Sequence, residues 1–136
     1  MINRKKGGNM DNMESLYNEF EQYFKDNQEK INYFLDVLKN TKEDRWKYQY
    51  FCIEKDDETK ETSILTYDNI KITSIVDKFY DYISYGTSTY YTIEIKIDNV
   101  VIYKIERADV LSELGDEIIA MLERAEKRAK QRSRNE

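Results

Sequence analysis

Residues 91–97 alternate apolar and polar side chains more strictly than any other part of the chain. The apolar members occupy every second position and are Tyr91, Ile93, Ile95 and Ile97. A period of two over this length predicts a β-strand with one buried and one solvated face. We therefore expect the fold to be built around a sheet that contains this strand.

A turn at Asp98-Asn99 leads from this strand into a second one at residues 100–106. A two-residue loop would place Ile93 opposite Lys104, which pairs unlike residues. Cross-strand pairs of like character therefore favour a three-residue loop. That loop sets Ile97 opposite Val101, Ile95 opposite Tyr103, Ile93 opposite Ile105 and Glu94 opposite Lys104.

Two long helices are expected at the ends of the chain. Residues 11–39 carry apolar residues at steps of four and three, with Asn27 as the one polar member, which predicts one long helix. Its wide apolar face can pack on the protein's own core or on a second copy. A last helix is expected from a cap at Asp109, with the same spacing at Leu111, Leu114, Ile118, Met121 and Ala125, fraying near Lys130.

The segment between these helices predicts three further strands, at residues 46–54, 63–67 and 70–72. A short helix is expected from Thr73 or Ser74 to Gly86, because apolar residues recur there at helical spacing. The predicted fold class is α+β. It combines a long N-terminal helix, an antiparallel sheet of four to five strands with a short inserted helix, and a long C-terminal helix.

A chain of 136 residues fits one domain, which we place at residues 10–130. Residues 1–9 are interpreted either as read-through of a leader or as an extension. The stretch Lys6-Gly7-Gly8-Asn9-Met10 can be encoded by a purine-rich ribosome-binding sequence followed by a start codon. Residues 131–136 are expected to be a disordered basic tail.

The net charge of −5 hides an uneven distribution. Residues 10–123 carry a net charge of −12, and residues 124–136 carry +4. The acidic body favours basic partners over nucleic acid and anionic membrane. The basic tail has no aromatic partners for nucleic acid, and its cations also complement the dipole of a helix C-terminus.

The composition removes several kinds of chemistry. Histidine is absent, so Ser-His-Asp and Cys-His arrangements are impossible. The one thiol, Cys52, lies among aromatic residues on a predicted strand and is expected to be a buried structural cysteine. The sequence contains no recognisable zinc site, calcium loop or glycine-rich phosphate-binding loop. We therefore expect no metal and no cofactor. Catalysis by Asp, Glu, Tyr or Lys alone stays open.

A single cysteine and the lack of a long apolar run indicate a cytoplasmic protein without a membrane span. The bias toward Lys, Asn, Ile and Tyr is typical of AT-rich codons, which suggests a low-GC bacterium or its mobile elements.

Tyrosine is the least ordinary feature of the composition, with twelve copies. Such residues serve either as core and boundary residues or as binding residues, because they supply large contact area at low entropic cost. Several of them are interleaved with acidic residues around the centre of the chain. The candidate partner-binding residues are Asp77, Tyr80, Asp81, Tyr82, Tyr85, Tyr90, Tyr91 and Glu94.

In this acidic, tyrosine-rich composition the chain resembles small inhibitor proteins of phages and plasmids, such as anti-CRISPR and other anti-defence proteins. The resemblance covers no motif, so it carries over no residue. It implies a non-enzymatic protein that inhibits a basic nucleic-acid-processing enzyme, such as a CRISPR effector or another nuclease, by mimicking nucleic acid. The alternatives are a homo-oligomeric regulatory or structural module and a nucleotide-binding sponge of a mobile element.

Overall fold

The computed structural model describes residues 14–135. The interpretations made above for residues 1–13 therefore lie outside the described residues. The chain divides into two compact units, Met1–Thr41 and Lys42–Glu136. Each unit is built around its own set of elements.

The first unit corrects the prediction of one long N-terminal helix. Residues 14–18 are helical, a 3₁₀ turn follows at Glu21–Tyr23, and a separate helix α2 spans Gln28–Asn40. Between them Asp26 takes a left-handed backbone conformation with φ of 69°, which no α-helix tolerates. The break falls beside Asn27, the polar member of the predicted apolar stripe.

Aromatic contacts explain why the chain bends there. The rings of Phe20 and Phe34 meet edge to face at 5.9 Å, and those of Tyr17 and Phe24 stack at 4.7 Å. In one straight helix Phe20 and Phe34 would be about 21 Å apart along the axis. Folding back therefore allows both rings to be buried together, which outweighs continuing the helix.

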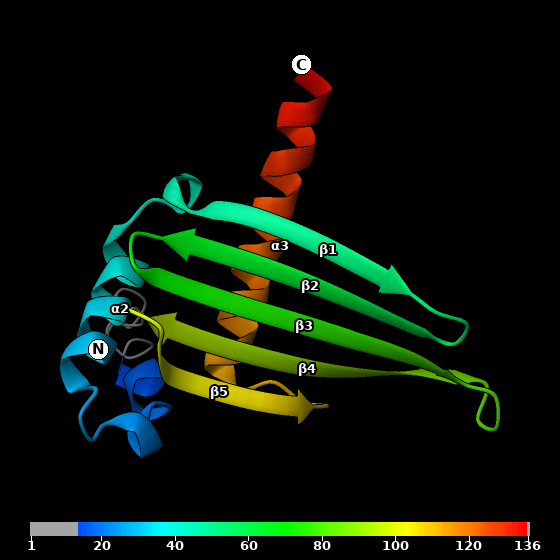
Figure 1. Ribbon diagram of the computed structural model, residues 1–136, viewed down its shortest axis with the longest axis horizontal. Coiled ribbons are helices and arrows are strands. Elements are labelled where there is room, and N and C mark those ends of the chain that lie inside the picture. The colour runs from blue at the N-terminus through cyan, green and yellow to red at the C-terminus, as the bar shows by residue number, and fades with distance from the viewer. Residues whose placement is uncertain (1–13, 136) are drawn as a thin grey trace, which may run out of the picture. The chain divides into compact units, whose positions relative to one another are not determined.

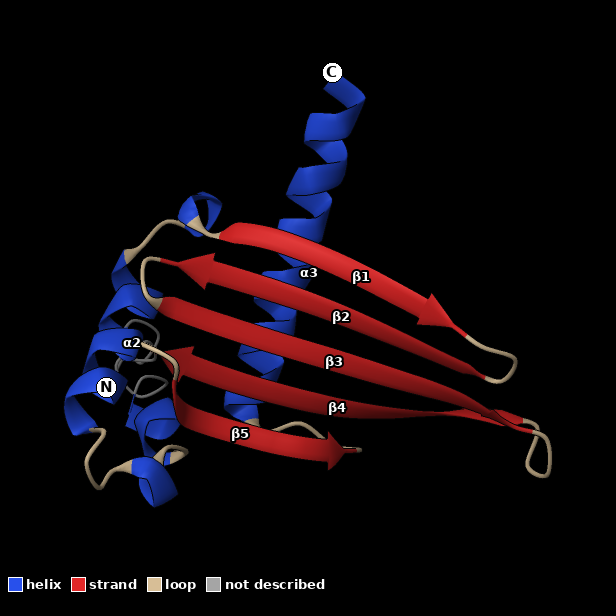
Figure 2. Ribbon diagram, viewed as in Figure 1, coloured by secondary structure: helices blue, strands red, loops and turns tan. Residues whose placement is uncertain are grey.

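The second unit is a five-stranded antiparallel sheet in which each strand pairs with the next along the chain (Figure 1). The strands are β1 at Lys47–Glu54, β2 at Glu58–Tyr67, β3 at Ile70–Asp81, β4 at Gly86–Ile97 and β5 at Val100–Ala108. A 3₁₀ turn, η2 at Glu43–Arg45, precedes the sheet, and helix α3 at Glu113–Asn135 follows it. Figure 2 shows the strands as one continuous layer.

The predicted short helix after Thr73 is wrong, because those residues are the second half of β3. Ile75 and Phe79 lie on one face of this strand, while Val76 and Tyr80 lie on the other. Because both faces are partly covered, apolar residues occur in adjacent pairs, and such pairs imitate helical spacing. Pairing with β2 on one side and β4 on the other decides in favour of the strand.

The β4–β5 hairpin confirms most of the predicted register and corrects its turn. Ile95 lies opposite Tyr103, Ile93 opposite Ile105 and Glu94 opposite Lys104, as expected. Ile97, however, lies opposite Val100, so the loop has only two residues, both with positive φ. A β-bulge between Ile95 and Lys96 then shifts the register and restores the like pairs.

Helix α3 runs across one face of the sheet, which we call the inner face (Figure 1). Ser112 caps the helix, because its side-chain oxygen accepts a hydrogen bond from the backbone N–H of Gly115 at 3.3 Å, so the predicted cap at Asp109 is wrong. It continues to Asn135, beyond the predicted fraying at Lys130. Its buried residues are Leu114, Ile118, Met121, Leu122 and Ala125. The inner face buries Leu65, Ile70, Ile72, Ile93, Ile95, Ile97 and Tyr103.

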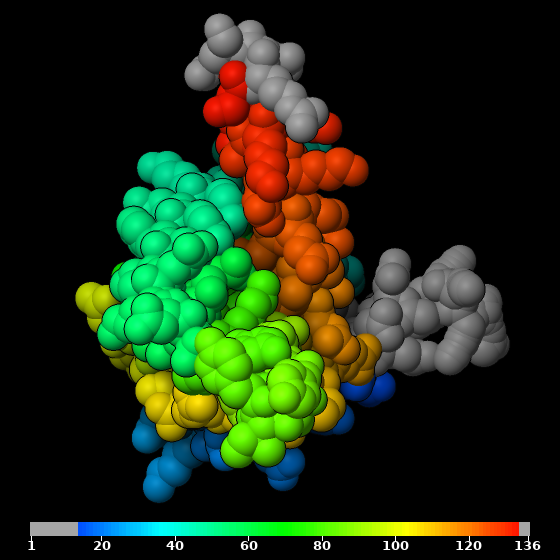
Figure 3. Space-filling model, turned by 90° about the vertical axis from the view of Figure 1, so that its right-hand side faces the viewer, coloured from blue at the N-terminus to red at the C-terminus, as the bar shows by residue number. Residues whose placement is uncertain are grey.

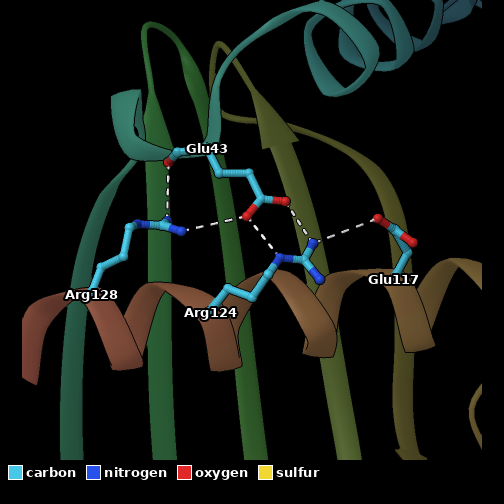
Figure 4. A network of polar contacts seen from close by, with 4 residues as sticks. All are labelled: Glu43, Glu117, Arg124 and Arg128. Carbon is cyan, nitrogen blue, oxygen red and sulfur yellow. Dashed lines mark hydrogen bonds and ion pairs between the residues drawn. The ribbon is translucent and has the colours of Figure 1, made fainter.

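An ion-pair network ties α3 to η2, the 3₁₀ turn before β1 (Figure 4). Arg124 donates two hydrogen bonds to the Glu43 carboxylate, at 2.8 and 2.6 Å, and Arg128 donates one to the Glu43 carbonyl oxygen at 3.2 Å. Glu117 lies 3.9 Å from Arg124. The hydrogen bond from Arg124 holds the pKa of Glu43 below its ordinary value. Two cations of the basic segment 124–136 therefore stabilise the fold.

Candidate functional site

A polar cavity lies between the inner face of the sheet and α3, where the apolar side chains of the strands give way to polar ones. Along β3 the inner-face residues change from Ile70 and Ile72 to Ser74, Val76 and Lys78. The same change occurs at Ser63 in β2, which lies opposite Ser74. The cavity that results has a volume of about 340 Å³. Its size falls at the lower end of small-molecule pockets, which span roughly 300–1,000 Å³.

Ser74 lies at the floor of this cavity. Its side chain is 1% exposed, and its hydroxyl has no hydrogen-bond partner among the described protein groups. A buried hydroxyl without a partner costs roughly 1–3 kcal/mol, so this position is expensive unless something in the cavity bonds to it. The neighbouring Ser63 differs, because its hydroxyl is hydrogen-bonded to Tyr48.

Three tyrosines, Tyr48, Tyr50 and Tyr91, line the walls of the cavity. Removal from water raises the pKa of Tyr48 and of Tyr50, and the negative charge of nearby Glu61 raises both further. Their hydroxyl groups therefore stay protonated and can act as hydrogen-bond donors as well as acceptors.

The second exposed feature is formed by the tips of two hairpins, β1–β2 and β3–β4. The backbone N–H of Tyr80 donates to the carbonyl oxygen of Asp57 at 2.9 Å, and the Tyr82 hydroxyl donates to the Asp57 carboxylate at 2.5 Å. Figure 3 looks onto these tips, which lie side by side. We call the residues that build this end the tip surface: Asp56, Asp57, Tyr80, Asp81, Tyr82, Ile83 and Tyr85.

Asp81 makes two hydrogen bonds within the loop of the tip surface. Its carboxylate accepts hydrogen bonds from the backbone N–H of Ile83 and from the hydroxyl of Ser84, both at 2.9 Å. The bond from Ser84, followed by that from Ile83, lowers the pKa of Asp81. Tyr82 is 61% exposed, Ile83 93% and Tyr85 81%. Large apolar side chains thus stand in solvent on an ordered loop.

The structure divides the sequence-predicted binding residues among three places. Tyr80, Asp81, Tyr82 and Tyr85 come together at the tip surface. Tyr91 lines the cavity instead. Asp77, Tyr90 and Glu94 lie on the outer face of the sheet, which is the face opposite α3.

On the outer face Asp77 is not available as a free negative charge. It is only 5% exposed, and its carboxylate lies 3.9 Å from Lys60 and 3.7 Å from Arg107. The Arg107 guanidinium in turn lies over the ring of Tyr90, 4.8 Å from its centroid. Glu94 is paired with Lys96 and Lys104. These two carboxylates are thus paired with four cations, so this part of the outer face presents no free negative charge.

Cys52 corrects a further expectation, because it is exposed rather than buried. It lies on β1, an outermost strand of the sheet, beyond the stretch that α3 covers. Apart from Tyr91, the residues of the cavity were missed from the sequence, above all Ser63 and Ser74. Their signal was the replacement of apolar residues by serine at inner-face positions, which becomes visible only once β3 is recognised as a long strand.

Within residues 14–135, no cluster of three or more acidic or cysteine side chains is arranged to hold a metal ion. No helix in the same range is long and apolar enough to cross a membrane. Comparison with protein-family models, with curated proteins and with solved structures gave no match.

Proposed function

We propose that the protein is a non-enzymatic binding protein that inhibits a basic nucleic-acid-processing enzyme by seating its tip surface in that enzyme's nucleic-acid-binding groove. The observation that supports this proposal is the exposure of Tyr82, Ile83 and Tyr85 on an ordered loop beside acidic residues. Aromatic anchors dominate the energetics of protein interfaces, and a loop already in its bound conformation loses little entropy on binding.

Charge supports the same direction. Asp56, Asp57 and Asp81 stand around the aromatic anchors, and residues 10–123 carry a net charge of −12. An acidic surface of this kind attracts a basic groove and speeds the encounter with it. Because Asp77 is buried and paired, the mimicry rests on the acidic residues at the tip and not on the outer face.

The proposal is tested by affinity capture from a low-GC bacterial lysate, followed by a nuclease assay of what is retained. The tip variant is Tyr82→Ser, Ile83→Ser and Tyr85→Ser together, and the control is Val110→Ser, an exposed apolar residue outside the tip. We expect the unchanged protein and the control to retain and inhibit a basic nuclease, and the tip variant to lose both. Equal inhibition by the tip variant would overturn the proposal.

Charge reversal is a second test of the proposed interface at the tip surface. Asp56 is exposed, so Asp56→Lys changes the charge of the tip without opening the fold, and Asp109→Lys is its matched control. With the captured enzyme, Asp56→Lys should slow association and make it less sensitive to salt, whereas Asp109→Lys should do neither.

A homo-oligomeric module is the second candidate, and the open edge of β1 favours it. Among the described strands β1 pairs only with β2, and it exposes Phe51 and Ile53. The nucleotide-binding alternative has less support. Among the described residues that line the tyrosine-lined cavity, three are acidic, Glu61, Glu123 and Glu126, and one is a cation, Lys78. This excess of negative charge repels phosphate groups.

A further inference from the structure

The cavity beneath α3 has the chemistry of a ligand site that the tip surface does not use. Its floor is the unpartnered hydroxyl of Ser74, at 1% exposure. A buried polar group of this kind is normally bonded, and Ser74 is one of the residues that line the cavity. An occupant that brings a hydrogen-bonding group to Ser74 would satisfy its hydroxyl.

The charges around the cavity indicate which charge a ligand bound there should carry. Lys78 lies 3.5 Å from Glu61, so the one lining cation is already paired with a lining carboxylate. Glu126 is paired with Lys130 at 3.1 Å. Glu123, an exposed residue of α3 at the cavity, makes no hydrogen bond or ion pair within the described residues, and the nearby cation Arg124 is hydrogen-bonded to Glu43. The lining therefore keeps a net negative charge that a cation would balance.

The walls favour an organic cation over a metal ion. Tyr48, Tyr50 and Tyr91 present aromatic rings and hydroxyl groups, and Leu122 and Ile119 of α3 add apolar surface. Aromatic rings attract ammonium groups through their negative faces, and apolar walls suit a methylene chain. Such a mixed lining does not provide the dense shell of oxygen ligands that calcium or magnesium requires.

The structure assigns to this cavity a site for a small alkyl amine, with one ammonium group among the tyrosines and Glu123 and its N–H donating to the hydroxyl of Ser74. The site is separate from the tip surface, so the ligand can bind whether or not the inhibitory function holds. Its volume of about 340 Å³ suits a short chain, such as a diamine.

The test uses three probes of equal length that differ in charge: 1,5-diaminopentane, 1,5-pentanediol and glutarate. Each is titrated into the full chain, and binding is followed by calorimetry and by chemical-shift changes of backbone amides. We expect the diamine to bind at one site and to shift the amides of Ser63, Ser74 and Tyr91. The diol and glutarate should bind at least about tenfold more weakly, because they lack the positive charge. Equal binding of the diol, or no binding of the diamine, would overturn the assignment.

Single variants distinguish binding of the diamine in the cavity from its general attraction to the acidic surface of the protein. Glu123→Gln should weaken diamine binding by up to about fivefold, as expected for a partly solvated ion pair. Glu106→Gln removes the same charge from the exposed end of β5 and should leave binding unchanged. Ser74→Ala removes the floor hydroxyl and should weaken binding while leaving the fold intact. An equal loss in Glu123→Gln and Glu106→Gln would show that the diamine only screens the acidic surface and that no site exists.

Discussion

At the scale of single residues, Ser74 and Ser63 form a natural comparison, because they are cross-strand neighbours with opposite hydrogen-bonding states. Replacing Ser74 by alanine removes a hydroxyl that has no partner among residues 14–135, so we expect the free energy of unfolding to rise by roughly 1 kcal/mol. Ser63→Ala removes the hydrogen bond to Tyr48 and should lower the free energy of unfolding by roughly 0.5–1.5 kcal/mol. Urea unfolding without added amine measures both. A loss of stability in Ser74→Ala as large as in Ser63→Ala would contradict this reading of the cavity floor.

Glu43 makes a pH-dependent contribution that can be isolated. Because Arg124 lowers its pKa in the folded state, the contribution is complete above the unfolded-state pKa, about 4.3, and is lost as the pH falls through the folded value. At pH 7 Glu43→Gln should lower the free energy of unfolding by roughly 0.5–1 kcal/mol, a range reduced for exposure to solvent. Urea unfolding at pH 7 and in acid compares the two proteins, with Asp109→Asn as control. If the difference in unfolding free energy between the unchanged protein and Glu43→Gln stays constant with pH, the ion pair is not the source of that difference.

At the scale of elements, the β4–β5 turn offers a test of why this hairpin forms. Asp98 and Asn99 both have positive φ, at 53° and 65°, which glycine adopts most readily. Asn99→Gly should therefore stabilise the protein by up to about 1 kcal/mol, and Asn99→Ala should destabilise it by roughly 1 kcal/mol. Asp98 is left unchanged because its side chain accepts a hydrogen bond from Asn69 at 2.9 Å. Thermal unfolding of the unchanged protein, Asn99→Gly and Asn99→Ala measures their order of stability.

The elements also show how far local sequence predicts this fold. The β4–β5 hairpin and the C-terminal helix were predictable, because each has one buried face and therefore a clean period. The second half of β3 was not, since partial burial on both faces produced a helical spacing. The break at Asp26 was hidden in an apolar stripe interrupted only at Asn27, and the aromatic contacts that explain it, such as that between Phe20 and Phe34, join residues far apart in the sequence.

The same reasoning applies to the candidate sites. The grouping of Tyr80, Asp81, Tyr82 and Tyr85 at one exposed place was predictable because they are close in sequence. The cavity was not, because its residues come from four strands and α3 and meet only through the register of the sheet. The burial of Asp77 was equally hidden, since Arg107 reaches it from β5.

At the scale of the whole molecule, the two outermost strands of the sheet differ in how they meet solvent. Strand β5 carries charged residues at Lys104, Glu106 and Arg107, and register shifts disturb its pairing with β4. Bulges and charges protect an edge from pairing with another chain. Strand β1 pairs with β2 along its whole length without a shift, and it exposes Phe51 and Ile53. It is therefore the edge of this sheet best suited to a second copy.

Strand geometry restricts how two copies could join at β1. Successive residues direct their backbone groups to opposite edges, so the groups free to pair come from every second residue. Antiparallel pairing then matches residues of the same face, which brings Phe51 and Ile53 of both copies together and leaves both α3 helices on one side. We expect light scattering at tens of micromolar protein to show a dimer, and Phe51→Lys to shift it to monomer by placing like charges at the joint. Val110→Lys, which adds the same charge at another exposed apolar residue, should remain dimeric. A monomer for the unchanged protein would exclude the oligomeric module and leave the edge of β1 free for another partner.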